Sequence, residues 1–560
     1  MTASLRRSLL SVVLAAAGAA LLPLGTHATT TAAAAAPRVA GPLVNVAWLE
    51  QALAAGDVLV LDAQPQPMHA ARHIAGAVNV DVFAFGGRER TPAEVEAHFQ
   101  SWGVGTDKRI VLVDQGAAYL ATRLFFDLVY QGFPAERVFV LDGGMAKWTE
   151  AGKPVTKEPT PAPARGSFRV TATPRDELRS RLPEFLNASG DTRRHALVEA
   201  LEPNYHFGEA KFFNRAGHVP NAIMMPSGDF FNADKTFKSP EEISRMAAYF
   251  GIQREQQVHA HCGGGVAATV PFFALKYIAG YPDVRLYKES QLEWLQDERT
   301  LPFWTYDAPM LQRDTGWLTG WSSRMLRMYA ATKVSIVDVR AAERYGRGHV
   351  PFSLSVPSEH FRRHLGEPAQ LAKLLGPAGV DATHEAVIVS DGGLNEHSAL
   401  AFLAFERLGQ KASILMDSVD EWGLRGGEIT KEPTAVGPKK SPLDVSIPPT
   451  AYPERARDGV VLRELPAPAR NAYPRVMLAA GAQAPAQAPA GAKLVHLPAR
   501  ELVNADGTPK AAKDLWSLLS KAGVPRYAEI VCIADNPGEA AMAYYVLRLM
   551  GYPDVKVLVA

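Results

Sequence analysis

The chain has 560 residues, which is enough for roughly three to five domains of ordinary size. Its formal net charge of +1 does not favour a polyanionic partner, so we expect no binding to nucleic acid. Only two cysteines are present, which excludes a disulfide framework and a cysteine-rich metal site.

The first 36 residues are typical of an export signal. Arg6 and Arg7 form a basic start, residues 9–24 form an apolar core, and small residues follow. We therefore expect a signal peptide over residues 1–36, a periplasmic or secreted protein, and no membrane span in the mature form. An uncleaved anchor is the alternative, although the apolar core is short for a membrane span.

A first unit of alternating strands and helices follows the signal. The motif His-Ile-Ala-Gly-Ala-Val-Asn begins at His73, and Asp114 directly follows an apolar run. Apolar runs predict strands, and a longer run predicts a helix. The expected strands are 58–63, 109–113 and 138–141, and the expected helix is 120–130.

The same order of elements recurs twice more along the chain. Related motifs begin at Gly217 (Gly-His-Val-Pro-Asn-Ala-Ile) and at Gly348 (Gly-His-Val-Pro). In each unit a strand-end residue precedes a glycine by 18 residues, and the pairs are Asp114 and Gly132, Cys262 and Gly280, and Asp391 and Gly409. Equal spacing indicates an internal repeat in which only the second unit carries a thiol at this position.

A fourth, degenerate unit completes the pattern. Residues 504–510 echo residues 232–238, and the corresponding strand-end position lies near Asp535. Units one and three both end in Thr-Lys-Glu-Pro-Thr, which indicates that a two-domain protein was duplicated whole. The predicted fold class is α/β, with four tandem domains that each contain a parallel sheet flanked by helices. The expected domains span residues 38–158, 167–310, 320–434 and 450–560.

Cys262 stands out as the candidate nucleophile. It follows an expected strand over residues 257–260 and precedes an expected helix over residues 268–279, with three glycines in between. Backbone N–H groups are unpaired at such a position and the helix dipole favours negative charge, so we expect a stabilised, reactive thiolate. Cys532 lies inside an apolar strand and is expected to behave as a small buried hydrophobe.

Together these motifs resemble the rhodanese superfamily, and specifically its tandem-domain thiosulfate and 3-mercaptopyruvate sulfurtransferases. The run Cys-Gly-Gly-Gly-Val-Ala-Ala from Cys262 is similar to the family's Cys-Gly-Ser-Gly-Val-Thr-Ala loop. The resemblance implies a silent first domain and an active second one. Cys262 would take the outer sulfur of a small anionic donor as a persulfide, and pass it to a thiol, cyanide or a small thiol-protein acceptor. It implies no metal and no organic cofactor.

The resemblance also suggests which residues bind the donor. The loop residues expected to do so are His261, Gly263, Gly264, Gly265 and Val266. Arg215 is the candidate cation for the donor's negative charge, with a solvated surface arginine as the alternative.

Mercaptopyruvate enzymes also resemble a protease triad, and Asp62 and His73 match its first two members. Both residues have a purely structural alternative. Gly264 replaces the triad serine, and Leu201 stands where relatives often carry a second arginine. The choice between thiosulfate and mercaptopyruvate therefore stays open.

The residues around Cys262 also bear on two other functions. Related phosphatases carry His-Cys-x5-Arg, but the sixth residue after Cys262 is Ala268, so no loop arginine is available to clamp a phosphoryl group. A non-enzymatic binding scaffold, or a persulfide or redox sensor, remains open because three of the four units lack a thiol in the loop.

Overall fold

The computed structural model describes residues 41–559 except 87–88, 171–173, 212, 470 and 486–491. The predicted signal at residues 1–36 lies outside the described residues. Within the described part of the chain, every helix is too short or too polar to cross a membrane.

Four five-stranded sheets are strung along the chain, and all their strand pairs are parallel. The first sheet contains β1 (Leu43–Val44), β2 (Val58–Asp62), β3 (Val78–Asn79), β4 (Arg109–Val113) and β5 (Val138–Leu141). The second contains β6 (Arg179–Ser180), β7 (His195–Glu199), β8 (Ala222–Met224), β9 (Gln257–His261) and β10 (Val284–Tyr287). The third contains β11 (Gln312–Arg313), β12 (Val334–Asp338), β13 (Leu354–Ser355), β14 (Glu385–Val389) and β15 (Ala412–Leu415). The fourth contains β16 (Val461–Leu462), β17 (Arg475–Ala479), β18 (Lys493–His496), β19 (Glu529–Ile533) and β20 (Val555–Leu558).

Helices connect the strands and cover the sheets. The helices around the first sheet are α1 (Val46–Ala55), α2 (Gln66–Ala71), α3 (Val82–Gly86), α4 (Pro92–Ser101), α5 (Leu120–Tyr130) and α6 (Gly144–Glu150). Those around the second are α7 (Leu182–Gly190), α8 (Pro203–His206), α9 (Pro240–Tyr249), α10 (Thr269–Phe273) and α11 (Ser290–Gln296). Those around the third are α12 (Thr315–Trp321), α13 (Arg324–Met328), α14 (Ala342–Arg347), α15 (Ser358–His364), α16 (Pro368–Leu375), α17 (Glu396–Leu408) and α18 (Val419–Leu424). The fourth sheet has α19 (Ala512–Ala522) and α20 (Pro537–Leu549).

The predicted α/β class with four tandem domains is confirmed. The first sheet has the order β1-β5-β4-β2-β3, and the other three repeat this order with their own strands. In β4 a run of four buried apolar residues follows Arg109, because helices bury both faces of a parallel sheet. We number the four domains by their sheets.

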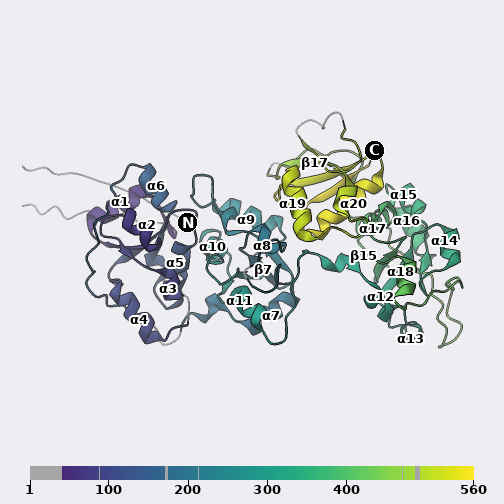
Figure 1. Ribbon diagram of the computed structural model, residues 1–560, viewed down its shortest axis with the longest axis horizontal. Helices are drawn as coiled ribbons and strands as arrows, with labels where there is room; N and C mark the ends of the chain where they lie inside the picture. The colour runs from purple at the N-terminus through teal and green to yellow at the C-terminus, as the bar shows by residue number, and fades with distance from the viewer. Residues whose placement is uncertain are drawn as a thin grey trace, which may run out of the picture.

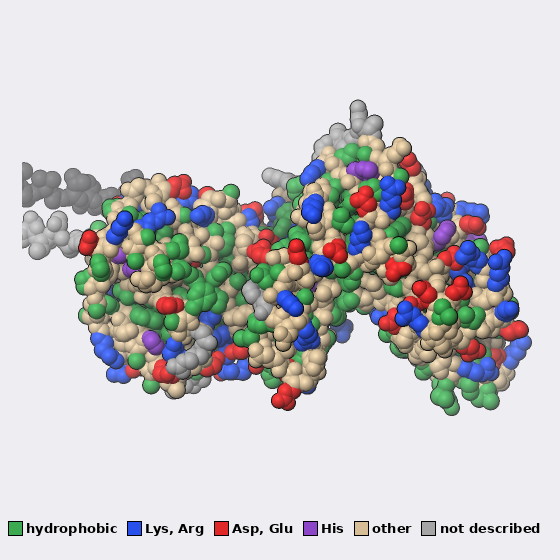
Figure 2. Space-filling model, in the orientation of Figure 1, with side chains coloured by type: hydrophobic (Ala, Val, Ile, Leu, Met, Phe, Trp, Pro, Cys, Tyr) green, Lys and Arg blue, Asp and Glu red, His purple; other side chains and the backbone are tan. Residues whose placement is uncertain are grey.

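The domains form two pairs with continuous cores. One hydrophobic cluster joins buried residues of domains 1 and 2, and another joins those of domains 3 and 4 together with Phe207 and Met224 of domain 2. The helix α5 packs on α10 within the first pair, and α17 packs on α20 within the second. In Figure 1 domain 4 lies between domains 2 and 3, so the order in space is 1, 2, 4, 3. On the face shown in Figure 2, acidic and basic side chains are interspersed along the molecule.

The register of the sheets corrects two of the predicted strand-end positions. Asp62 pairs with Val113, Glu199 with His261, Asp338 with Val389, and Ala479 with Ile533. The residues that follow these strands are therefore Asp114, Cys262, Ser390 and Ala534. The predictions of Asp391 and of a position near Asp535 were wrong by one residue. Six residues separate strand and helix in both domain 1 (114–119) and domain 3 (390–395), so the extra residue before Gly409 lies in α17 and not in the loop.

Candidate active site

Cys262 lies at the carboxyl end of β9, in a loop that the start of α11 holds in place. The Cys262 N–H donates to Ser290 Oγ at 3.0 Å, and the Gln291 N–H donates to the Cys262 carbonyl at 3.0 Å. The Leu292 N–H donates to the Gly263 carbonyl, also at 3.0 Å. The predicted helix after the loop begins at Thr269 and continues from Ala274 to Ile278 as a π-helical turn.

Two of the loop glycines have different roles. The Gly265 N–H donates to Cys262 Sγ at 3.1 Å, and Gly265 has a φ of +76°. A Cβ atom on Gly265 would lie 1.8 Å from the Lys288 carbonyl oxygen, so only glycine fits there. A Cβ atom on Gly264 would meet nothing within 4 Å.

Cys262 borders a cavity of about 520 Å³ between domains 1 and 2. The loop contributes Cys262, Gly263, Gly264, Val266 and Ala267, domain 1 contributes Val82, Phe83, Gly86, Tyr119 and Arg123, and the rest of domain 2 contributes Ala200, Leu201, Glu202, Tyr205, Phe213 and Ser227. The cavity therefore joins the only described loop thiol to side chains of the neighbouring domain.

Arg123 of α5 is the cation that the structure brings to this cavity. Its guanidinium donates to the Gly265 carbonyl at 3.4 Å and to the Gly86 carbonyl at 3.3 Å, and it pairs with Asp127 at 3.0 Å. Next to α5, Thr122 Oγ1 lies 2.8 Å from Thr269 Oγ1 across the domain boundary. The prediction from sequence missed Arg123. The available signal was an Arg–Asp pair in the otherwise apolar helix 120–130, because charged side chains are rarely fully buried unless they are paired.

The acidic side of the cavity is Glu202. Its burial, and then the neighbouring Asp229, raise the pKa of the Glu202 carboxyl. The site thus places a buried guanidinium and a carboxyl of weakened acidity around one thiol.

Arg215 lies outside this cavity, contrary to the role expected for it. Its guanidinium donates to the Leu301 carbonyl at 2.6 Å and lies over the Phe303 ring at 5.6 Å. The reason is that its loop pairs with the end of domain 2, where His218 and Trp304 exchange two backbone hydrogen bonds.

His261 also lies outside the residues that line the cavity. Its ring is buried against Phe185, with ring centroids 5.0 Å apart, and its Nε2 lies 3.7 Å from Glu199 Oε1. Side chains alternate along a strand, so His261 on β9 faces the side of the sheet opposite to Cys262. Burial lowers the pKa of His261 to about 4 although Glu199 opposes this shift.

Asp62 and His73 are brought together, but in the interior of domain 1. His69 Nδ1 lies 2.7 Å from Asp62 Oδ2, and the His69 and His73 rings stack at 3.9 Å. The His73 backbone also pairs with Thr156. Neither Asp62 nor His73 lines the cavity around Cys262, and their contacts match the structural alternative.

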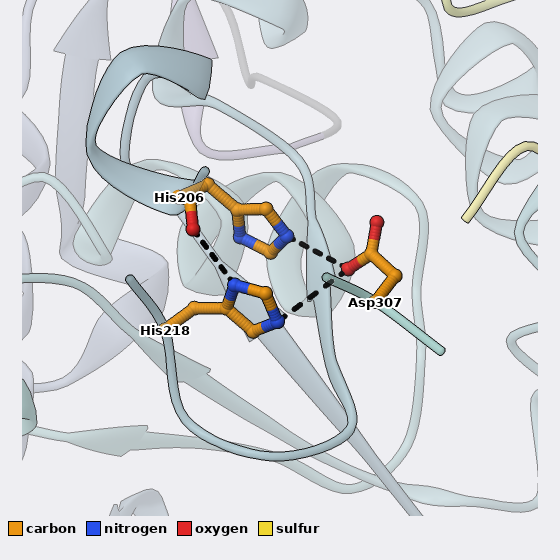
Figure 3. Close-up of side chains that lie close together, drawn as sticks. All are labelled: His206, His218 and Asp307. Carbon is orange, nitrogen blue, oxygen red and sulfur yellow. Dashed lines mark hydrogen bonds and ion pairs between the residues drawn. The ribbon is translucent and has the colours of Figure 1, made fainter. Parts of the chain in front are cut away.

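Domain 2 carries a similar stack that sequence analysis did not single out. The His206 and His218 rings are parallel within 2° at 3.7 Å, and Asp307 lies beside both (Figure 3). Burial opposes a charge on His206, but Asp307 and Glu199 outweigh it and raise the pKa of His206 to about 9. Burial and then the charged His206 lower the pKa of His218 to about 4. The available signal was the repeated spacing of seven residues from Asp62 to His69 and from Glu199 to His206.

Cys532 is buried inside β19 and belongs to the core of domains 3 and 4. Burial raises the pKa of its thiol. Both cysteines are free. Cys532 thus has the surroundings of a core residue, whereas Cys262 borders a cavity.

Comparison with known proteins identifies the family. The rhodanese-like domain family matches residues 45–151, 183–297 and 323–424, which is more than half of the chain. A probable 3-mercaptopyruvate sulfurtransferase from Pseudomonas aeruginosa is 30% identical over 46% of this chain and 96% of its own length. The sulfur carrier protein TtuD of Thermus thermophilus is 28% identical over 45% and 93%, and the thiosulfate sulfurtransferase of Gallus gallus 29% over 45% and 92%. A solved anaerobic ergothioneine biosynthesis enzyme from Chlorobium limicola superposes with a TM-score of 0.42 and 23% identity over 47% of this chain and 70% of that chain. The relatives with curated names support sulfur transfer in general, and the chain belongs to the rhodanese family.

Proposed function

We propose that Cys262 takes up a sulfane sulfur from a small anionic donor and holds it as a persulfide for transfer to an acceptor. The observation that carries this proposal is the Cys262 thiol itself, which borders an interdomain cavity that Arg123 also lines. The Gly265 N–H on its sulfur supports it further, because a donor at that position stabilises the thiolate that attacks the sulfur donor.

The proposed reaction balances without a cofactor. With thiosulfate, the Cys262 thiolate attacks the outer sulfur, a new S–S bond forms, and the old S–S bond breaks as sulfite leaves with its electron pair. With 3-mercaptopyruvate, the C–S bond breaks and pyruvate leaves after it gains a proton. In the second half, an acceptor thiolate or cyanide attacks the terminal sulfur and returns Cys262 as a thiolate.

The donor is proposed as one of these two anions, since relatives carry names for both. Arg123 supplies a positive charge that either donor needs. Arg215 does not line the cavity, and Leu201 makes one of its walls apolar. We therefore propose that Arg123 binds the anion in place of Arg215.

The test is to incubate the full chain with each donor and measure its intact mass. We expect one added sulfur atom on Cys262, release of that sulfur as thiocyanate when cyanide is added, and no loading of Cys262→Ser. Cys532→Ser is the matched control and should load normally, because that thiol is enclosed in a different core. If neither donor loads the protein, the proposal fails.

A sulfur-carrier role is the second candidate, because one relative is named a sulfur carrier protein. A carrier would load on Cys262 in the same way but pass sulfur to a protein thiol far faster than to cyanide. Comparing the two acceptors after a single loading step separates the roles.

A further inference from the structure

Arg327, near the end of α13, is a buried arginine without a carboxylate partner in the described part of the chain. The residue is only 7% exposed. Its Nη2 donates to the Val334 carbonyl at 3.5 Å, which is long for a hydrogen bond, and its Nε is buried and makes no hydrogen bond within the described residues. The guanidinium also lies over the Phe352 ring, 5.2 Å from the ring centroid. Arginines are rarely buried without a paired charge, so the protein itself leaves the charge of Arg327 uncompensated.

The pKa of Arg327 reflects the same isolation. Burial alone shifts this pKa and lowers it to about 10. Burial acts on Arg179 as well, but the hydrogen bond to Tyr130 and the charge of Glu289 outweigh it and raise the pKa of that guanidinium. A pKa of about 10 still leaves Arg327 charged at neutral pH. A positive charge is therefore held inside domain 3 without a negative charge beside it.

Arg327 lines a cavity of about 230 Å³ at the amino ends of β12 and β14. Residues 445–448 of the connector that follows domain 3 form one wall of this cavity. The connector is held there because the Ile447 N–H donates to the Ala435 carbonyl and the Gly437 N–H donates to the Ile447 carbonyl, both at 2.9 Å. The cavity thus lies at the edge of the sheet opposite to the carboxyl edge, where domain 2 carries the Cys262 loop.

Positive groups outnumber negative ones around this cavity. Asp381 is the only acid among the lining residues, and the basic ones are Arg327, Lys333, His384 and Lys439. The Asp381 carboxylate already accepts hydrogen bonds from the Thr383 N–H at 2.8 Å and from the Thr383 hydroxyl at 2.7 Å. Burial lowers the pKa of His384, although Asp381 opposes this shift. The arginine and the two lysines, less the one carboxylate, leave two positive charges, which favours a dianion as the ligand.

Ser335 of β12 adds a hydroxyl donor to the cavity. Its Oγ accepts the Asp381 N–H at 3.1 Å and makes no other hydrogen bond within the described residues, so its own O–H is free to donate to a ligand. The residues at the same strand position in the other domains are apolar, namely Leu59, Ala196 and Val476. Domains 1 and 2 also have a single helix, α1 or α7, between their first two strands, which are joined by fully described segments, whereas domain 3 has both α12 and α13 there. The basic cavity is therefore a feature of domain 3 and not of the repeat.

We propose that this cavity binds a tetrahedral oxyanion, a sulfate or phosphate group, with Arg327 as its principal ligand. The N–H groups of a guanidinium form a fork that matches two oxygens of such an anion. The Ser335 hydroxyl is a further donor, and Lys333 and Lys439 add positive charge. The anion supplies the negative charge that domain 3 does not place beside Arg327. This site is independent of the proposed sulfur transfer, because the residues that line the cavity around Cys262 all belong to domains 1 and 2.

The test is a calorimetric titration of the full chain with sodium sulfate and, separately, with sodium phosphate, in chloride buffer at constant ionic strength. Arg327→Gln should weaken binding at least about 10-fold, because the charge and its hydrogen bonds to the anion are lost together. Lys333→Gln changes an exposed side chain and should weaken binding about 2- to 5-fold while the fold is kept. Sulfate can also enter the cavity of Cys262, so the titration is repeated with Arg123→Gln, which should retain the binding at Arg327.

Thermal melts supply a second readout and a matched control. Arg313→Gln makes the same exchange at an arginine of domain 3 that pairs with Glu385 at 2.8 Å, so it should melt below the parent and still respond to sulfate. Arg327→Gln removes an uncompensated buried charge, so in chloride alone it should melt at or above the temperature of the parent. Millimolar sulfate should raise the melting temperature of the parent and not that of Arg327→Gln. General exclusion of sulfate from protein surfaces would act on both proteins equally.

The phosphate monoester O-phosphoserine identifies the source of the oxyanion. Tighter binding than that of inorganic phosphate would indicate a group on a larger molecule, weaker binding would indicate the free ion, and both agree with the proposal. The proposal is overturned if none of the three compounds binds, if Arg327→Gln binds them as the parent does, or if only Arg123→Gln abolishes binding. A lower melting temperature of Arg327→Gln with an unchanged response to sulfate would assign Arg327 a purely structural role. Sulfur loading on Cys262 would be unaffected by any of these results, since it takes place in a different cavity.

Discussion

Replacement of Gly265 by alanine should impair the candidate site far more than the same change at Gly264. A Cβ atom on Gly265 would lie 1.8 Å from the Lys288 carbonyl oxygen, whereas real Cβ contacts almost never fall below 3.0 Å. The loop and the segment before α11 must therefore separate by at least about 1.2 Å. Gly264→Ala meets no atom within 4 Å and serves as the matched control.

Two effects determine how far Gly265→Ala lowers the stability of the loop and slows persulfide formation. A left-handed backbone costs a non-glycine residue about 1–2 kcal/mol, which lowers the stability of the loop at Gly265. The same displacement removes the Gly265 N–H from Cys262 Sγ, now at 3.1 Å. A hydrogen bond to a charged group contributes about 1.5–3 kcal/mol, so persulfide formation should slow by about 10- to 150-fold.

The assay is a single-turnover measurement of sulfite release from thiosulfate, with intact mass as the second readout. Thermal melting shows whether Gly265→Ala is folded at the assay temperature, so that slow loading is not confused with unfolding. Equal rates for folded Gly265→Ala and Gly264→Ala would refute the assigned role of the Gly265 N–H.

Three further predictions concern single side chains. Arg123→Gln should raise the donor concentration needed for half-maximal loading by about 10- to 100-fold, because it removes the positive charge at the cavity. Arg123→Lys should retain part of the donor binding. An unchanged donor dependence in both variants would contradict the role of Arg123. Gly264→Ser should melt like the parent, and it should shift the ratio of loading rates from thiosulfate toward 3-mercaptopyruvate. The reason is that it introduces the triad serine hydroxyl that the resemblance to mercaptopyruvate enzymes implies at this position. An unchanged ratio would show that position 264 does not select the donor. Burial lowers the pKa of His259 to about 3, and the ring accepts or donates to Ser180 Oγ at 2.6 Å. The unfolded chain binds a proton at His259 below about pH 6.5 and the folded chain does not, so this group alone lowers stability by about 1.4 kcal/mol per pH unit between about pH 6 and pH 4. Buried His218 and His261 add to the same slope. His259→Gln should reduce the slope by about the share of one histidine in melting experiments, and an unchanged slope would contradict the role of His259.

The sequence predicts local elements well and contacts between elements poorly. The strands β4 and β5 and the helix α5 have the predicted bounds, because each is a short apolar run with clear ends. Arg123 was missed because it reaches the Cys262 loop only when α5 packs on α10, and that contact joins residues far apart in the chain. Arg215 was misplaced for the converse reason, since closeness in sequence to the His218 motif says nothing about which way its side chain points.

The second domain pair lacks both the thiol and the cation of the candidate site. Arg123 lies nine residues before Gly132, and the residue nine before Gly409 in domain 3 is Leu400. The equivalent of Cys262 in domain 4 is Ala534, and Leu400 is buried in the core shared by α17 and α20. This pair therefore keeps the packing of the first but has an apolar side chain in place of both reactive groups. A guanidinium buried at a domain interface is costly unless it serves a charge. Leu400 avoids that cost in the second pair, which has no thiol to serve, and this agrees with the proposed role of Arg123 beside Cys262.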